Sequence, residues 1–181
     1  MPKVIVLFHN ADPAAESLVE KAASGASSVR FTEVDVRSIG QADPSPERRR
    51  TRSASVDEMR AYDGVIVACC AEGLVLDELI RLVDDLGAVP NLNYANVVFT
   101  VLGAGDTRLL AHVARLGGIV VTTRSADQSD AHAATASART AKVVSWVRHS
   151  LSHEHDRDHH DHEHHDHEHS HHHSHEHRPT A

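Results

Sequence analysis

The 181-residue sequence is poor in aromatic residues and cysteine, and it has no long apolar run. Aromatic residues make up 3% of the chain, so the hydrophobic core must be built mainly from Val, Leu, Ile and Ala. Cys69 and Cys70 are the only cysteines and offer no disulfide framework, which favours a reducing compartment. No segment approaches the roughly 18 apolar residues of a transmembrane helix, and the first residues lack the hydrophobic region of a signal peptide. We therefore expect a cytoplasmic protein that does not insert into membranes.

The excess of acidic charge is unevenly distributed along the chain. The formal net charge is -8 at pH 7 with His neutral. Residues 1–152 carry 18 Asp or Glu against 16 Lys or Arg, whereas the remaining residues carry eight acids against Arg157 and Arg178. A nearly neutral body is not expected to bind nucleic acid, so small molecules or metal ions are the expected partners.

Strand-like and helix-like segments alternate along the body. Strands are predicted at residues 3–8, 30–36, 64–70, 95–102 and 119–123, and helices at 14–26, 55–62, 74–87, 106–118 and 127–151. Asp12 and Pro13 are typical of a helix start. The segment at 30–36 alternates apolar and polar residues and is expected at a sheet edge, whereas the β-branched runs fit strands buried on both faces.

This order predicts an α/β fold with right-handed crossovers between parallel strands. We expect a five-stranded parallel doubly wound sheet with the flavodoxin-like strand order 2-1-3-4-5 over residues 1–151. Residues 38–54 are expected to form a long loop. Residues 152–181 are rich in His, Asp and Glu and are expected to form a disordered tail, because they have almost no apolar side chain to bury.

Ligands of open parallel sheets bind beyond the carboxyl ends of the strands, where the strand order reverses. The loops at that point follow the first, third and fourth strands. They read HNADPAAES (9–17), CCAEGLVL (69–76) and LGAGDT (102–107). Any small-molecule site of the body is therefore expected in these three loops.

With these loops, the chain resembles the flavodoxin-like, WrbA-type NAD(P)H:quinone oxidoreductases, which bind FMN. The resemblance covers roughly residues 1–150 and rests on PKVIVLF before the 9–17 loop, EMRAYDGVIVAC, LGAG after the fourth strand and LGGIVV at the fifth. It implies a phosphate-binding loop after the first strand, electron transfer from NAD(P)H to a quinone-like acceptor, and a homo-oligomer. The residues that would contact FMN are Asn10, Ala14, Ala15, Ser17, Ala71, Gly73, Gly103 and Gly105. No catalytic residue is assigned.

The phosphate loop departs from the family pattern. Asn10 stands in place of an early Ser or Thr, and Pro13 stands in place of a Gly. Asp12 adds a negative charge where a phosphate dianion would bind. The loop after the third strand has no aromatic ring that could stack on a flavin. The alternative is therefore a flavodoxin-like body that binds no flavin.

Three side chains near these loops are further candidates. His9 ends the first strand and is a conceivable ligand or proton donor. Cys69 and Cys70 end the third strand, where a thiol could be redox-active or bind a soft metal. The alternative for the cysteines is that they are small buried hydrophobic residues.

The C-terminal segment is the strongest chemical signal. Of the 25 residues 153–177, fourteen are His and eight are Asp or Glu. Neutral imidazole suits Ni²⁺, Zn²⁺, Co²⁺ and Cu²⁺, and repeated His-acid-His offers many sets of ligands. The alternative is a solvated segment that meets metal only incidentally. The candidate ligands are His153, His155, His159, His160, His162, His164, His165, His167, His169, His171, His172, His173, His175 and His177.

Two functions remain open. The chain could be a relative of FMN-dependent NAD(P)H:quinone oxidoreductases with a metal-binding tail. Alternatively, it could be a non-enzymatic metal buffer or metallochaperone on a flavodoxin-like scaffold.

Overall fold

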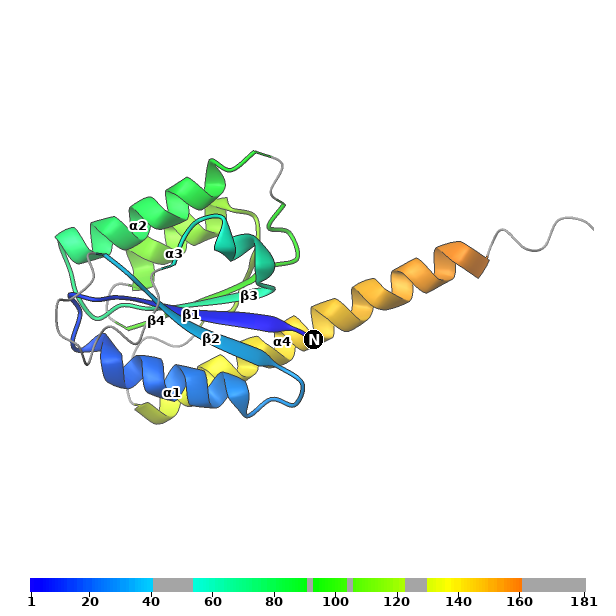
Figure 1. Ribbon diagram of the computed structural model, residues 1–181, viewed down its shortest axis with the longest axis horizontal. Coiled ribbons are helices and arrows are strands. Elements are labelled where there is room, and N and C mark those ends of the chain that lie inside the picture. Colours follow the sequence, from blue (N-terminus) through cyan, green and yellow to red (C-terminus); the bar gives the residue numbers. More distant parts are fainter. Residues whose placement is uncertain (41–53, 91–92, 104–105, 123–129, 161–181) are drawn as a thin grey trace, which may run out of the picture. The chain divides into compact units, whose positions relative to one another are not determined.

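The computed structural model describes residues 1–40, 54–90, 93–103, 106–122 and 130–160 (Figure 1). The chain divides into two compact units, Met1–His149 and Ser150–Ala181. The expected loop at 38–54 falls largely outside the described residues, as do the predicted site residue Gly105 and the tail from residue 161.

The first unit contains one parallel sheet. Its strands are β1 (Lys3–His9), β2 (Glu33–Ile39), β3 (Gly64–Ala68), β4 (Val98–Leu102) and β5 (Ile119–Val120). Their order is β2-β1-β3-β4-β5, which confirms the predicted topology and places the partly polar β2 at an edge. The register aligns His9 with Ile39 and Ala68 with Leu102, so the loops after the strands emerge from one edge of the sheet.

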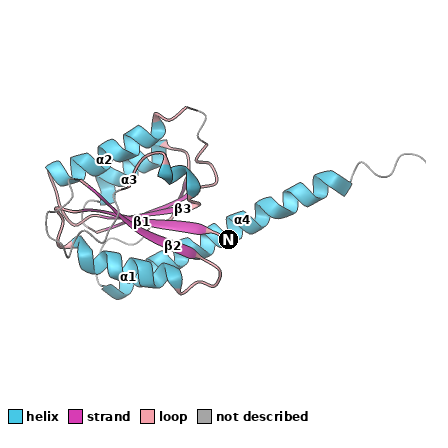
Figure 2. Cartoon of the chain, viewed as in Figure 1, coloured by secondary structure: helices cyan, strands magenta, loops and turns pink. Residues whose placement is uncertain are grey.

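Helices cover both faces of the sheet (Figures 1 and 2). Helices α2 (Leu74–Gly87) and α3 (Asp106–Arg115) lie on one face. Helix α1 (Ala15–Ser27) and the part of α4 (Asp130–His160) up to His149 lie on the other. The predicted bounds of α2 are those observed, because Leu76, Leu79 and Val83 mark its buried face. None of the helices that the structure describes combines the length and apolar composition needed to cross a bilayer.

The local predictions were wrong at several boundaries. Helix α1 begins at Ala15, with Ala14 rather than Asp12 as the residue that precedes it. The two turns predicted at 55–62 are a single 3-10 turn, η2 (Glu58–Ala61), because Tyr62 is already extended before β3. Strand β5 has two residues where five were predicted.

The tail was expected to be disordered from residue 152, but the backbone of α4 remains helical to His160. No Gly or Pro occurs between residues 119 and 178, so nothing in the sequence interrupts this helix. Helix extension adds one hydrogen bond per residue and needs no apolar side chain. Lack of apolar residues therefore excluded a packed core in this segment but not a helix.

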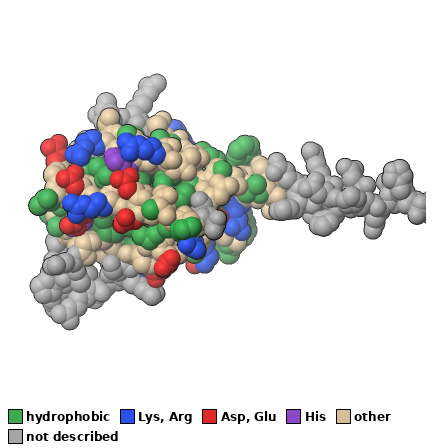
Figure 3. All heavy atoms as spheres, turned by 90° about the horizontal axis from the view of Figure 1, so that it is seen from above, with side chains coloured by type: hydrophobic (Ala, Val, Ile, Leu, Met, Phe, Trp, Pro, Cys, Tyr) green, Lys and Arg blue, Asp and Glu red, His purple; other side chains and the backbone are tan. Residues whose placement is uncertain are grey.

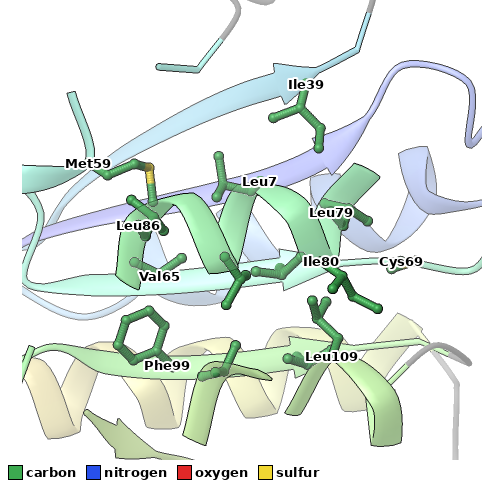
Figure 4. Close-up of a cluster of buried hydrophobic side chains, with 14 of the residues drawn as sticks. Leu7, Ile39, Met59, Val65, Cys69, Leu79, Ile80, Leu86, Phe99 and Leu109 are labelled. Atoms are coloured by element: carbon green, nitrogen blue, oxygen red, sulfur yellow. The ribbon is translucent and has the colours of Figure 1, made fainter. Parts of the chain in front are cut away.

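The main core lies between the sheet and helices α2 and α3 (Figure 4). Phe99 is 1% exposed, and the centre of its ring lies 6.0 Å from that of Tyr94. The Tyr94 hydroxyl group donates a hydrogen bond to the Leu86 carbonyl at 2.9 Å. The other large members are aliphatic, as the scarcity of aromatic residues predicts: Ile5, Leu7, Leu79, Leu86, Leu109 and Val113. On the opposite face, Thr100 and Thr140 join β4 to α4 through a buried hydroxyl pair at 2.6 Å.

Candidate functional site

The candidate site lies at the carboxyl edge of the sheet, where Asp12 joins the loops that follow β1 and β3. The Asp12 side chain follows β1 and is 2% exposed. One carboxylate oxygen accepts the backbone N–H groups of Cys70 at 2.7 Å and Ala71 at 3.0 Å, in the loop after β3. The other accepts the N–H of Ala15, the first residue of α1, at 3.3 Å. A single carboxylate thus ties together two loops and the start of a helix.

His9 occupies the end of β1 and is also buried. Its Nδ1 atom accepts the N–H of Ala11 at 3.0 Å, so the ring proton of neutral His9 must be on Nε2. Nε2 lies 2.6 Å from Oε2 of Glu78 on α2 and donates to it. Because both ring nitrogens have protein partners, His9 fixes the 9–12 loop against α2 and presents no free nitrogen to a ligand.

A groove of about 240 Å³ lies beside the His9–Glu78 pair. Three charged residues of α2 line it: Glu78, Arg81 and Asp85. These three residues are not among the site residues predicted from the sequence, although their spacing places them on one helix face. None of the predicted cofactor residues that the structure describes lines the groove, whose lining is Ile39, Gly40, Ala54, Glu78, Arg81, Leu82 and Asp85.

The outer surface of α2 is joined to α3 by two charged pairs. Arg108 donates to Asp77 at 3.0 Å, and His112 Nδ1 lies 2.7 Å from an Asp84 oxygen. Acidic and basic side chains are interspersed on the face of the body shown in Figure 3. His112 therefore has a structural partner on the neighbouring helix.

The two cysteines are in different surroundings but share one electrostatic effect. Cys69 is fully buried among core side chains and donates its S–H to the Ala71 carbonyl at 3.3 Å (Figure 4). Burial, reinforced by the negative charge of Asp12, raises the pKa of the Cys69 thiol to about 11. The same two causes raise the pKa of Cys70, which is partly exposed. Both shifts disfavour the reactive thiolate.

The folded chain is consequently expected to react slowly with a disulfide reagent. At neutral pH, we expect the rate with dithiobis(nitrobenzoic acid) to be at least about tenfold lower than for the same chain unfolded in guanidinium chloride. Following thionitrobenzoate release over time measures both rates. Rapid release by the folded chain would instead indicate an accessible thiolate and favour a redox or metal-binding role for these residues.

The predicted glycines have different surroundings. Gly103 has φ +101°, and a Cβ atom built on it would overlap the Cys69 carbonyl group, 2.8 Å from its carbon. Its lack of a side chain is thus explained by contact between two loops of the chain. Gly73 precedes α2 with φ +66° and has nothing within 4 Å of a built Cβ, so only its backbone conformation requires glycine.

The predicted FMN contacts in and after the loop that follows β1 do not form one cluster. The Asn10 N–H donates to the Ile39 carbonyl at 3.0 Å, and Ser17 is an exposed residue in the first turn of α1. The N–H groups of Ala15 and Ala71, both predicted to contact FMN, lie close together because they share the Asp12 carboxylate.

The described residues do not fit the phosphate of FMN. A phosphate dianion needs unpaired N–H donors and a neutral or positive surrounding. At this site the N–H groups of Ala15, Cys70 and Ala71 already donate to Asp12, whose negative charge would repel a second anion.

Within the described part of the chain, no group of three or more His, Cys, Asp or Glu side chains is arranged to hold a metal ion. The predicted metal ligands are all in the C-terminal segment. His153, His155, His159 and His160 belong to the helical backbone of α4, and those from His162 to His177 lie outside the described residues.

No known family model matches the sequence, and no curated protein sequence matches it. Solved structures do match its fold. A diflavin flavoprotein from Nostoc sp. aligns with 83% of this chain and 97% of its own at 11% identity and a TM-score of 0.59. A flavodoxin from the domain Archaea aligns with 79% of this chain and 99% of its own at 14% identity and a TM-score of 0.54. A flavone reductase aligns with 81% of this chain but 64% of its own, at 14% identity and a TM-score of 0.52. The chain has the flavodoxin-like fold.

Proposed function

We propose that the chain binds divalent transition-metal ions through its His-rich C-terminal segment, and that the flavodoxin-like body is a folded support for that segment. The observation that carries this proposal is the density of ligands in residues 153–177, fourteen of which are His. Neutral imidazole binds Ni²⁺, Zn²⁺, Co²⁺ and Cu²⁺, and the intervening carboxylates compensate the charge of the ion.

The helical part of the segment supports the proposal. Positions 155 and 159 both lie within α4, which extends to His160, and are four residues apart. Two imidazoles at this spacing on a helix are able to chelate one ion. The residues beyond His160 supply further His-acid-His sequences, so we expect several ions per chain rather than one defined centre.

The other candidate is an FMN-dependent NAD(P)H:quinone oxidoreductase. It is favoured by the family resemblance of the sequence and by flavodoxin and flavoprotein structures of the same fold. The position of Asp12 argues against it, because its buried carboxylate lies in the loop that would bind the phosphate and would repel a second anion. An absorption spectrum distinguishes the two, since a flavoprotein shows the absorption bands of bound flavin, whereas the metal-binding support shows none and retains none after it is mixed with FMN and desalted.

Deleting residues 153–181 is expected to abolish tight binding of Ni²⁺ and Zn²⁺. Calorimetric titration of the full chain should show several ions bound at neutral pH and far fewer near pH 5, because protonated imidazole is not a ligand. The truncated chain should bind little at either pH and keep the circular dichroism of the folded body.

A matched variant separates imidazole from carboxylate ligands. Replacing the fourteen histidines of 153–177 by Gln keeps all eight acids and should abolish transition-metal binding as fully as the deletion does. Retention of Ni²⁺ or Zn²⁺ by either variant would contradict the proposal. In cells, unchanged metal tolerance after the deletion would argue against a role in metal buffering.

A further inference from the structure

The buried carboxylate of Asp12 has the surroundings that proteins commonly give to a bound oxyanion. The N–H groups of Cys70 and Ala71, after β3, donate to one of its oxygens. The N–H of Ala15, at the start of α1, is shared between the other oxygen at 3.3 Å and the Asp12 backbone carbonyl at 3.1 Å. Backbone N–H groups at a helix start and in a loop are the usual donors to phosphate. Here they meet a side chain of the same polypeptide.

The carboxylate is held by these donors rather than by a basic side chain. Among the described residues, no Lys or Arg forms an ion pair with Asp12, whose exposure is 2%. A buried negative charge requires compensation, and hydrogen bonds from N–H groups supply it. The N–H groups of Cys70 and Ala71 would in turn be unsatisfied if the carboxylate were absent and nothing replaced it, whereas that of Ala15 would keep the Asp12 carbonyl at 3.1 Å.

The position of Asp12 in the fold relates these hydrogen bonds to a phosphate-binding site. The residue lies after β1, in the loop where the family resemblance places the phosphate of FMN. Its partners come from the loop after β3, 58 and 59 positions away in the sequence. The site thus retains a set of converging donors, while the chain itself supplies the anion.

We propose that Asp12 is an internal ligand that takes the place of a cofactor phosphate, and that removing its carboxylate opens the site to external oxyanions. The N–H groups of Cys70 and Ala71 consequently have an acceptor within the chain and need no cofactor. The inference concerns the body alone and does not depend on metal binding by the C-terminal segment.

The test compares the full-length chain with its Asp12→Ser, Asp12→Asn and Glu20→Gln variants. Ser removes the charge and leaves space, whereas Asn removes the charge and fills the space. Glu20→Gln removes one charge from an exposed position on α1. Inorganic phosphate, FMN and riboflavin are titrated against each protein, with binding followed by calorimetry and by the shift of the thermal midpoint. A chelator is present so that a metal-loaded tail cannot bind phosphate.

Asp12→Ser is expected to bind phosphate and FMN at least about tenfold more tightly than the unmodified chain, because the repelling charge is removed and the N–H groups of Cys70 and Ala71 are left without an acceptor. Its thermal midpoint should be lowered without phosphate and partly restored by it. Riboflavin, which lacks the phosphate, should produce no comparable restoration. Asp12→Asn and Glu20→Gln should show no gain in binding.

The inference is overturned if the unmodified chain binds FMN as tightly as Asp12→Ser, or if Asp12→Ser gains no affinity for either anion. Should Asp12→Ser be unfolded in buffer, recovery of helical circular dichroism in phosphate supports the inference, and failure to recover it contradicts the inference. Equal gains by Glu20→Gln would also contradict it, since they would reflect net charge rather than the site.

Discussion

Gly103→Ala is expected to lower the free energy of unfolding by about 3 kcal/mol. Two independent penalties add at this position. The backbone has φ +101°, which a residue with a Cβ atom rarely adopts. The added methyl group would also overlap the Cys69 carbonyl group at the end of β3, and a backbone carbonyl cannot rotate away as a side chain can. Urea unfolding followed by circular dichroism measures the loss.

Gly117→Ala is the matched control for the overlap. Gly117 also has a positive φ, +78°, but nothing lies within 4 Å of a built Cβ atom. This variant should lose only the conformational penalty, about 1–2 kcal/mol. Equal losses in the two variants would show that the contact with Cys69 costs nothing and that the loops after β3 and β4 separate freely.

The group that approaches Gly103 could not be predicted from the sequence. The segment LGAG was interpreted as a loop that a cofactor approaches closely. Glycine at such a position indicates that some backbone or ligand approaches closely, but not which one. In this chain the neighbour is the carbonyl group of Cys69, 34 positions earlier. Only the three-dimensional arrangement distinguishes the two.

The fold was predictable because its signals are local and redundant. The β-branched runs at β1, β3 and β4 have no polar alternation and alternate with helical segments, which leaves few topologies. The amphipathic pattern of α2 gave both of its ends. Boundaries were less accurate where the signal was weak, as at η2 and β5, and at the end of α4, where no breaker residue follows.

The candidate site was less predictable because its contacts join residues distant in sequence. The sequence shows that Asp12 places a negative charge where a phosphate would bind. Its hydrogen bonds to Cys70 and Ala71 depend on the three-dimensional arrangement of the loops after β1 and β3, which the sequence does not show. The His9–Glu78 pair joins residues 69 positions apart, and Glu78 was not singled out at all. A charged stripe at 78, 81 and 85 on an amphipathic helix was the available signal.

The second large effect is expected from Gly25→Ala in helix α1. In an exposed helix, replacing Gly by Ala normally stabilises by about 1 kcal/mol. Here a built Cβ atom lies 2.7 Å from the Cα and carbonyl carbon of Ala134 in α4 and overlaps its oxygen. The two helices must move apart, which opens the core beneath them. We expect a net loss of about 2 kcal/mol in urea unfolding.

Gly87→Ala tests whether this loss comes from helix–helix contact rather than from glycine replacement itself. Gly87 is the last residue of α2 and is exposed, and a built Cβ atom meets only the side-chain tip of Leu116, at 3.1 Å. That flexible tip is able to move by a few tenths of an ångström, so the variant should be neutral or slightly stabilised. If Gly25→Ala were as stable as Gly87→Ala, α1 and α4 would not be in close backbone contact. A loss confined to Gly25→Ala would establish that this contact sets the spacing of the two helices beneath the sheet.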